Sequence, residues 1–240
     1  MPSLPLPISR VDLADVTGSQ DPPSISPAIK FCGLTRPGDA ALAQQLGAQY
    51  LGGIRAGGPR LLTAEQWSDV LGEPRADVER VAVLGPMSAQ DVVDETRALG
   101  ADIAQWHGDP DAQSVAIVAD GGVRVWPVLR IAAGPLPSEA WALAKHADAL
   151  VLDAKVPGQL GGTGVALDWA ALASDIERWR ADCPGVHLVL AGGLHAGNVA
   201  QAIALLHPDV VDVSSGVELA PGIKDPERMR AFVHAVRGRD

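Results

Sequence analysis

A cysteine ends the first short apolar run of the chain, in the stretch "IKFCGLTRPGDA" (residues 29–40). Such a cysteine can be a small buried hydrophobe. Its thiolate can instead act as a base or nucleophile, if neighbouring cations or dipoles lower its pKa from about 8.5. Lys30 precedes Cys32 by two residues, so in a strand both side chains point to the same face. Thr35 and Pro37 predict a helix directly afterwards, with Thr35 as its cap.

A carboxylate ends another apolar run, "ALVLD", whose last residue is Asp153. An aspartate there can cap a loop or helix, or it can serve as a general acid at the mouth of a site. The following segment, 154–164, is rich in glycine and carries Lys155. We expect this segment to be mobile enough to close over a ligand. Arg60 and His107 follow two further runs, in "RAGGPR" and "QWHGD".

Glycine and serine follow the last two apolar runs. Gly192 and Gly193 stand in "AGG", and Ser214, Ser215 and Gly216 stand in "SSG". Backbone N–H groups in such loops can bind phosphate, and glycine lets the backbone approach the anion closely. Each motif alone could be a tight turn with helix caps. Their shared position after the last two runs favours a phosphate site.

Eight short apolar runs alternate with eight candidate helices from residue 29 onward. The runs cover residues 29–34, 50–54, 80–84, 102–106, 123–131, 149–153, 187–191 and 210–214. The candidate helices cover residues 37–48, 63–72, 88–100, 111–119, 137–147, 168–182, 196–207 and 226–238. Strict alternation predicts a parallel sheet, whose strands are buried on both faces. Eight units in about 210 residues predict a closed (β/α)8 barrel, with a doubly wound open sheet as the alternative. In such barrels the chemistry sits at the carboxyl ends of the strands, where the polar and glycine residues above gather.

The whole chain has 240 residues and a net charge of −10, which disfavours nucleic acid and anionic membrane surfaces as partners. The sequence has no apolar run of membrane-spanning length and no secretory signal pattern, so we expect a cytoplasmic protein. The cysteines Cys32 and Cys183 are expected to be reduced thiols, and no paired Cys/His spacing indicates a metal site. Residues 1–28, rich in Pro and Ser, are predicted to be a flexible extension, and 29–240 the barrel domain.

The motifs, in this order, resemble those of phosphoribosylanthranilate isomerase, a barrel-enzyme family of the tryptophan pathway. "IKFCGLTRPGDA" is similar to the family's Lys-x-Cys-Gly-x-Thr motif, and "QWHGD" to its Gln-Leu-His-Gly motif. The segments "LVLDAKVPGQLGGTGVALDW", "LAGGLHAGNVAQAI" and "VDVSSGVELAPGIKDPERMRAFV" complete the set. Any one match is weak, but five in order are specific. Trp106 replaces the usual leucine, at a position that the strand period turns outward.

The resemblance implies an Amadori rearrangement of N-(5-phosphoribosyl)anthranilate to 1-(2-carboxyphenylamino)-1-deoxyribulose 5-phosphate. Asp153 would protonate the ribose ring oxygen and open the ring to a Schiff base, and Cys32 would remove the proton from the sugar C2. Arg60 would hold the anthranilate carboxylate, for which its fork is suited. His107 would line the pocket, and Asp212 would orient a sugar hydroxyl or its loop. No cofactor is implied, and the chain has neither a G-x-G-x-x-G nor a P-loop motif.

An anionic phosphoribosyl substrate needs a locally positive mouth on this acidic protein, for which Lys30, Arg60 and Lys155 are candidates. The resemblance also implies that Lys30 would favour the thiolate or steady the substrate. Two other functions stay open. A histidine-pathway or bifunctional isomerase would use two aspartates and a second phosphate cradle, and Cys32 argues against it. A non-catalytic phosphosugar-binding barrel would not need Cys32 or Asp153. A monomer and a homodimer are both compatible with the sequence.

Overall fold

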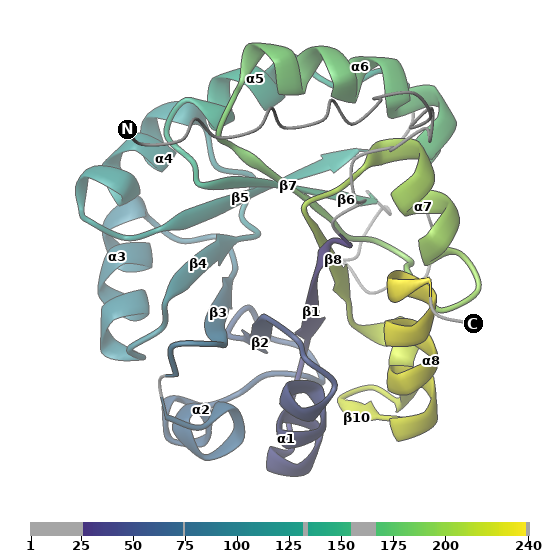
Figure 1. Ribbon diagram of the computed structural model, residues 1–240. Coiled ribbons are helices and arrows are strands. Elements are labelled where there is room, and N and C mark those ends of the chain that lie inside the picture. Colours follow the sequence, from purple (N-terminus) through teal and green to yellow (C-terminus); the bar gives the residue numbers. More distant parts are fainter. Residues whose placement is uncertain (1–25, 74, 132–133, 155–166, 239–240) are drawn as a thin grey trace, which may run out of the picture.

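The computed structural model describes residues 26–73, 75–131, 134–154 and 167–238. Eight parallel strands form a closed barrel in chain order (Figure 1), which confirms the predicted (β/α)8 fold and excludes the open sheet. The strands are β1 (Ala28–Cys32), β2 (Tyr50–Ile54), β3 (Glu79–Leu84), β4 (Ile103–Trp106), β5 (Val125–Ile131), β6 (Ala149–Ala154), β7 (His187–Leu190) and β8 (Val210–Val213).

Eight α-helices of the described residues surround the barrel (Figure 1). They are α1 (Pro37–Gln45), α2 (Ala64–Leu71), α3 (Ala89–Ala98), α4 (Ala112–Asp120), α5 (Glu139–Ala144), α6 (Trp169–Asp182), α7 (Val199–Leu206) and α8 (Pro226–Arg237). Each lies within the range predicted for it, except that α4 ends one residue later, at Asp120. None of the helices described is long and apolar enough to cross a membrane. Residues 1–25 of the predicted extension and residues 155–164 of the segment predicted to close over a ligand, including Lys155, lie outside the described residues.

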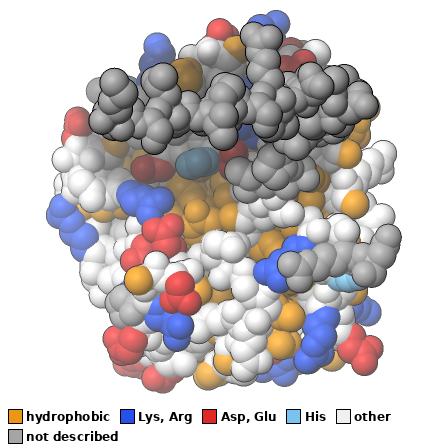
Figure 2. All heavy atoms as spheres, viewed as in Figure 1, with side chains coloured by type: hydrophobic (Ala, Val, Ile, Leu, Met, Phe, Trp, Pro, Cys, Tyr) orange, Lys and Arg blue, Asp and Glu red, His pale blue; other side chains and the backbone are white. Residues whose placement is uncertain are grey.

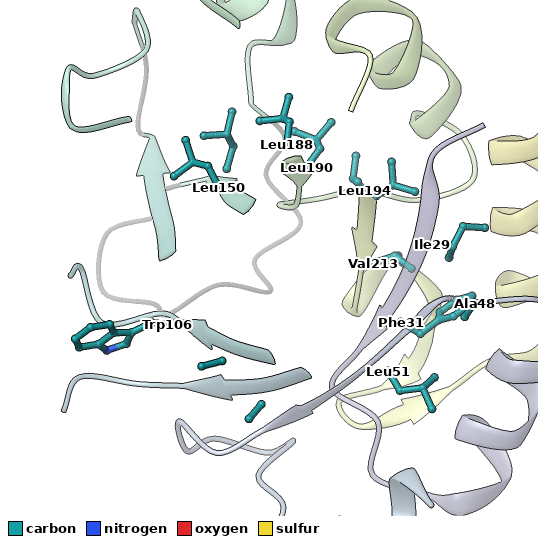
Figure 3. Packing of buried hydrophobic residues seen from close by; sticks show 14 of the residues in the cluster. Ile29, Phe31, Ala48, Leu51, Trp106, Leu150, Leu188, Leu190, Leu194 and Val213 are labelled. Atoms are coloured by element: carbon teal, nitrogen blue, oxygen red, sulfur yellow. The ribbon is translucent and has the colours of Figure 1, made fainter. Parts of the chain in front are cut away.

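Alternating side chains of each strand fill two separate cores, because successive residues of a strand point to opposite faces. Val81, Val151 and Val189 belong to the core inside the barrel. A larger core lies between the barrel and the helices, and Figure 3 shows Ile29 and Phe31 of β1 among its members. Trp106 belongs to this outer core, as its strand position predicts. The alternation therefore fixes which strand residues can reach the barrel interior.

The structure differs from the prediction in the cap of α1 and most strongly in the start of α7. Thr35 does not cap α1: the cap residue is Arg36, whose side chain makes no capping hydrogen bond, although Pro37 does open the helix. The Thr35 hydroxyl instead donates to the carbonyl of Gly222. The seventh helix begins only at Val199, three residues later than predicted. In the turn before it, the His195 backbone N–H donates to the Asn198 side chain at 2.8 Å.

A small hairpin between β8 and α8 is an addition that the sequence did not predict. It consists of β9 (Glu218–Ala220) and β10 (Ile223–Lys224), which pair antiparallel after a short 3-10 helix, η1 (Ser215–Val217). Strands of three and two residues are too short to give a recognisable hydrophobic period. The start of α1 holds the hairpin, because the Asp39 carboxylate accepts from the Lys224 backbone N–H at 3.1 Å. The last and first units of the barrel are therefore joined at the mouth.

Candidate active site

A cavity of about 480 Å³ opens at the carboxyl ends of the strands. Figure 2 shows the same view as Figure 1, with hydrophobic side chains gathered in a hollow at the centre of this face and charged side chains around it. Most of the predicted site residues line the cavity: Cys32, Arg60, His107, Asp153, Gly192, Gly193, Asp212, Ser214 and Ser215. Lys30 and Gly216 are absent from its lining. Residues from six of the eight βα units thus converge on one site.

The cysteine side of the cavity is built on a buried ion pair. Lys30 and Cys32 both point into the barrel, and the fully buried Lys30 Nζ donates to Asp212 Oδ2 of β8 at 2.7 Å. Burial alone would lower the pKa of Lys30, but the charge of Asp212 and its hydrogen bond with Lys30 outweigh burial and raise that pKa. Lys30 is therefore a protonated ammonium beside the thiol, in a place with little water to screen it.

The pKa of the Cys32 thiol lies above its ordinary value. Burial raises it most, the Lys30 ammonium opposes this rise, and the Asp212 carboxylate adds to it. A thiolate that is stable at neutral pH would need a lowered thiol pKa, and in the free protein this pKa is raised instead. Cys32 is a neutral thiol near neutral pH, and once deprotonated it is a stronger base than an ordinary cysteine thiolate.

Gly52 of β2 leaves the space that the thiol and the ammonium occupy. A Cβ at Gly52 would lie 3.0 Å from Cys32 Sγ and 3.1 Å from Lys30 Nζ, closer than ordinary contacts. Lys30 cannot easily move away because Asp212 holds it, and the added Cβ would also lie 3.1 Å from the backbone Cα of Cys32. The absence of a side chain at this inward strand position is therefore part of the site.

We expect Gly52→Ala to lower the free energy of unfolding by about 1–3 kcal/mol, the usual effect of overpacking. Activity should fall as well, because the added methyl group displaces the Cys32 sulfur or the Lys30 ammonium. Urea unfolding and steady-state kinetics measure both effects. Gly38→Ala is the matched control, because a Cβ at Gly38 meets nothing within 4 Å. A Gly52→Ala protein with the stability and activity of the wild type would contradict this account.

Asp153 lies at the end of β6, on the same inward face as Val151. Its Oδ1 accepts from the Ala154 backbone N–H at 2.9 Å, and its Oδ2 lies 3.1 Å from His107 Nε2. A Cβ at Gly192 would come within 2.7 Å of Asp153 Oδ1, so the glycine makes room for this carboxylate. Asp153 is thus buried, oriented by two contacts, and open to the cavity on its remaining side.

The two predicted phosphate loops pack directly on one another after β7 and β8. A Cβ at Gly216 would overlap the carbonyl oxygen of Leu194, so Gly216 serves the contact between the loops and does not line the cavity. Gly192 and Gly193 both have positive φ, at 84° and 65°, which glycine adopts without strain. The two loops present backbone and hydroxyl groups, and no acidic side chain of either loop lines the cavity.

Three buried polar atoms of the cavity lining have no hydrogen-bond partner among the described residues: Gln105 Oε1, His107 Nδ1 and Asp212 Oδ1. A buried polar atom without a partner costs about 1–3 kcal/mol, so a hydrogen-bond partner at any of these atoms would stabilise the site. The sequence prediction missed Gln105. Its signal was available, because Gln105 stands between Ile103 and His107 in the inward period of β4.

Two further charged residues behind the cavity were also missed. Glu218 accepts from Arg60 Nε at 2.9 Å and from Arg60 Nη2 at 2.7 Å, while Lys224 Nζ donates to Glu218 Oε1 at 2.7 Å. Glu218 and Lys224 are both buried and belong to the hairpin, whose presence no periodicity indicated. The predicted carboxylate-binding residue, Arg60, is therefore already held on one side.

Comparison with known proteins identifies the family. The family model described as N-(5'-phosphoribosyl)anthranilate isomerase matches residues 29–235 of this chain. An enzyme of that name from Acidithiobacillus ferrooxidans is 39% identical over 211 residues, which cover 88% of this chain and 97% of the relative.

Solved structures agree with this match. The phosphoribosyl anthranilate isomerase of Thermotoga maritima superposes with a TM-score of 0.77 at 26% identity, covering 89% of this chain and 100% of that one. Another isomerase structure, in complex with reduced 1-(o-carboxyphenylamino)-1-deoxyribulose 5-phosphate, has a TM-score of 0.73 at 25% identity, with coverages of 89% and 100%. Barrel, family model and relatives lead to one assignment: the chain belongs to the N-(5'-phosphoribosyl)anthranilate isomerase family of tryptophan biosynthesis.

Proposed function

We propose that this chain converts N-(5-phosphoribosyl)anthranilate to 1-(2-carboxyphenylamino)-1-deoxyribulose 5-phosphate, with Asp153 as general acid and Cys32 as general base. The observation that carries the proposal is that these two side chains, from strands that lie three positions apart around the barrel, line the same cavity. An acid and a base on either side of one sugar are what an aldose–ketose rearrangement requires.

The reaction starts with proton transfer from the Asp153 carboxyl group to the ribose ring oxygen. The C1–O bond breaks, the anthranilate nitrogen lone pair forms a C=N bond, and a protonated Schiff base results. Cys32 then takes the proton from C2, and the electrons of the C–H bond move toward the iminium nitrogen to give an enolamine. Tautomerisation of the enolamine, which places a proton on C1, yields the ketone at C2.

Lys30 supports the base in this scheme. Its ammonium stabilises the thiolate at the moment when Cys32 is deprotonated, and Asp212 keeps that ammonium charged and in place. Since the thiol pKa of the free protein is raised, only a small thiolate fraction is ready at neutral pH. The cost of forming the thiolate is offset by its greater basicity toward the weakly acidic C2 proton.

The anionic ends of the substrate are proposed to bind at separate places of the cavity. The loops with Gly192, Gly193, Ser214 and Ser215 offer backbone and hydroxyl donors for the phosphate. Arg60 binds the anthranilate carboxylate, and Gln105, His107 and Asp212 line the part of the cavity proposed for the sugar hydroxyls. Gly216 contributes through the packing of its loop.

Arg60→Ala is expected to raise KM by about tenfold to a hundredfold with a much smaller change in kcat, because a carboxylate far from the reacting carbon is bound equally in the ground and transition states. Steady-state kinetics with N-(5-phosphoribosyl)anthranilate measures the split. The control is Arg75→Ala, since Arg75 is an exposed residue away from the cavity. An unchanged KM in Arg60→Ala would place the carboxylate site elsewhere.

The proposed function is tested by the loss of anthranilate-type fluorescence when the purified chain meets freshly generated N-(5-phosphoribosyl)anthranilate. Rapid loss supports the proposal. No loss with a folded protein would overturn it and would favour a barrel that binds a phosphosugar without turnover.

We also propose that the chain works in the cytoplasm, because a catalytic Cys32 must stay a free thiol, and reducing compartments keep thiols in that state. A small phosphoribosyl compound is the proposed partner, and neither nucleic acid nor membrane is expected. Whether the chain is a monomer or a homodimer stays an open prediction.

A further inference from the structure

Three charged side chains contact one another in a row behind the mouth of the cavity. Arg60 comes from the loop after β2, Glu218 from β9 and Lys224 from β10. The Glu218 carboxylate lies between the two cations, at 2.7 Å from Arg60 Nη2 and 2.7 Å from Lys224 Nζ. Lys224 is fully buried and Glu218 is 6% exposed, so water screens neither contact well.

The contact with Glu218 uses only one edge of the Arg60 guanidinium. Nε donates to Oε1 at 2.9 Å and Nη2 donates to Oε2 at 2.7 Å. A guanidinium has five N–H donors, so both N–H groups of Nη1 and one of Nη2 are left. Those remaining donors form a second fork, which matches a carboxylate. Arg60 lines the cavity and Glu218 does not, so the second fork is the one that a ligand in the cavity can use.

Lys224 keeps Glu218 from turning away from Arg60. Its Nζ donates to Glu218 Oε1 and, at 3.1 Å, to the carbonyl of Ser214. Its backbone N–H donates to Asp39 of α1 at 3.1 Å, which fixes the strand that carries it. Burial raises the pKa of Glu218, but the hydrogen bonds from Arg60 and the charge of Lys224 outweigh burial and lower it. Glu218 thus stays an anion with a fixed orientation.

The stem of Arg60 is confined as well. A Cβ at Gly33 would lie 2.6 Å from Arg60 Cδ, so the stem passes directly over the backbone of Gly33. Gly33 has a φ of 67°, in the left-handed region that glycine favours. The side chain of Arg60 is therefore held at its middle by the first βα loop and at its head by Glu218.

We propose that Glu218, held by Lys224, is a positioning residue that fixes the free edge of Arg60 for the anthranilate carboxylate of the substrate. This inference rests on the role of Arg60 in the proposed function and deepens it. Preorganisation of this kind lowers the entropy lost when the substrate carboxylate binds a long, otherwise mobile side chain. A second account assigns Glu218 only the neutralisation of one of the two cations beside it.

Two variants of Glu218 distinguish these accounts. Glu218→Gln removes the anion, so neutralisation alone predicts tighter binding of every anionic ligand, since the charge of Arg60 then remains uncompensated. Glu218→Asp keeps the charge but shortens the side chain, so neutralisation predicts no change. Positioning predicts weaker carboxylate binding in both variants, because neither side chain can hold both Arg60 and Lys224.

The experiment uses the full chain and two probes: anthranilate, which carries the carboxylate, and inorganic phosphate. Binding is measured by calorimetry, and KM and kcat are measured with N-(5-phosphoribosyl)anthranilate. We expect each Glu218 variant to bind anthranilate about tenfold more weakly and to show a similar rise in KM, with kcat and phosphate affinity changed less than about threefold. Glu227→Gln is the control, because it makes the same charge change at an exposed position of α8 and should alter nothing.

The experiment distinguishes failure of the positioning role from failure of the proposed function. Unchanged or tighter anthranilate binding in both variants would overturn the positioning role. Equal losses for both probes, with a loss of circular dichroism, would show a structural role and would also overturn it. A wild-type chain that binds no anthranilate and turns over no substrate would overturn the proposed function, and the inference with it.

Discussion

Replacing Cys32 by serine is expected to lower kcat by about 10²- to 10⁴-fold, the usual contribution of a general base, while leaving the barrel folded. Serine is nearly isosteric with cysteine, so the contacts with Gly52 and Lys30 are kept. Its hydroxyl, however, is far harder to deprotonate than a thiol, even beside an ammonium. The C2 proton then has no competent acceptor, and the reaction stops at the Schiff base.

Cys183→Ser is the matched control, because the second cysteine is partly exposed beyond the end of α6 and lies outside the cavity. Wild-type kcat/KM should rise with pH through the thiol pKa, on the alkaline side of the ordinary cysteine value, since the active form is deprotonated and the pKa is raised. Cys32→Ser should lack this rise. A serine variant with near-normal turnover would remove Cys32 from the mechanism.

Asp153→Asn should be about as damaging as loss of the base, with kcat lowered by about 10²- to 10⁴-fold. The amide oxygen still accepts from the Ala154 backbone N–H, so the side chain keeps its place beside Gly192. What it lacks is a proton acidic enough to pass to the ribose ring oxygen. Without that transfer the ring stays closed, and Cys32 has no acidified C2–H to act on.

Single-turnover measurements of the fluorescence decay test this prediction, because they separate ring opening and rearrangement from product release. Asp120→Asn serves as the control, since Asp120 is exposed at the end of α4. If Asp153→Asn raised KM alone and left the single-turnover rate intact, Asp153 would be a binding residue and another group would supply the proton.

The strand residues of the site were predictable because the alternation of inward and outward side chains along a strand determines both which residues pack in each core and which residues reach the cavity. Val151 and Asp153 share the inward face of β6, and Lys30 and Cys32 share that of β1. Once the apolar runs are identified as barrel strands, the polar residues at their carboxyl ends have one place to go. The same period places Trp106 outward, in the core beneath the helices.

Contacts between loops were not predictable in this way. Thr35 looks like a helix cap in sequence, but its hydroxyl is used by Gly222, 187 residues further along the chain. From the sequence alone, Glu218 and Lys224 resemble ordinary surface charges. In the structure the hairpin places both side chains in the interior. The net pKa of Cys32 also depends on how deeply the thiol is buried, a property of the packed barrel that residue spacing does not contain.

The ion pair between Lys30 and Asp212 joins residues 182 positions apart, on the first and last strands. During synthesis the first strand leaves the ribosome long before the eighth strand is made. Lys30 therefore has no counter-ion until most of the chain has been synthesised. Until then, inserting the ammonium into the barrel interior would cost several kcal/mol. Premature closure of a seven-stranded intermediate is thereby penalised, and catalytic competence appears only when the ring is complete.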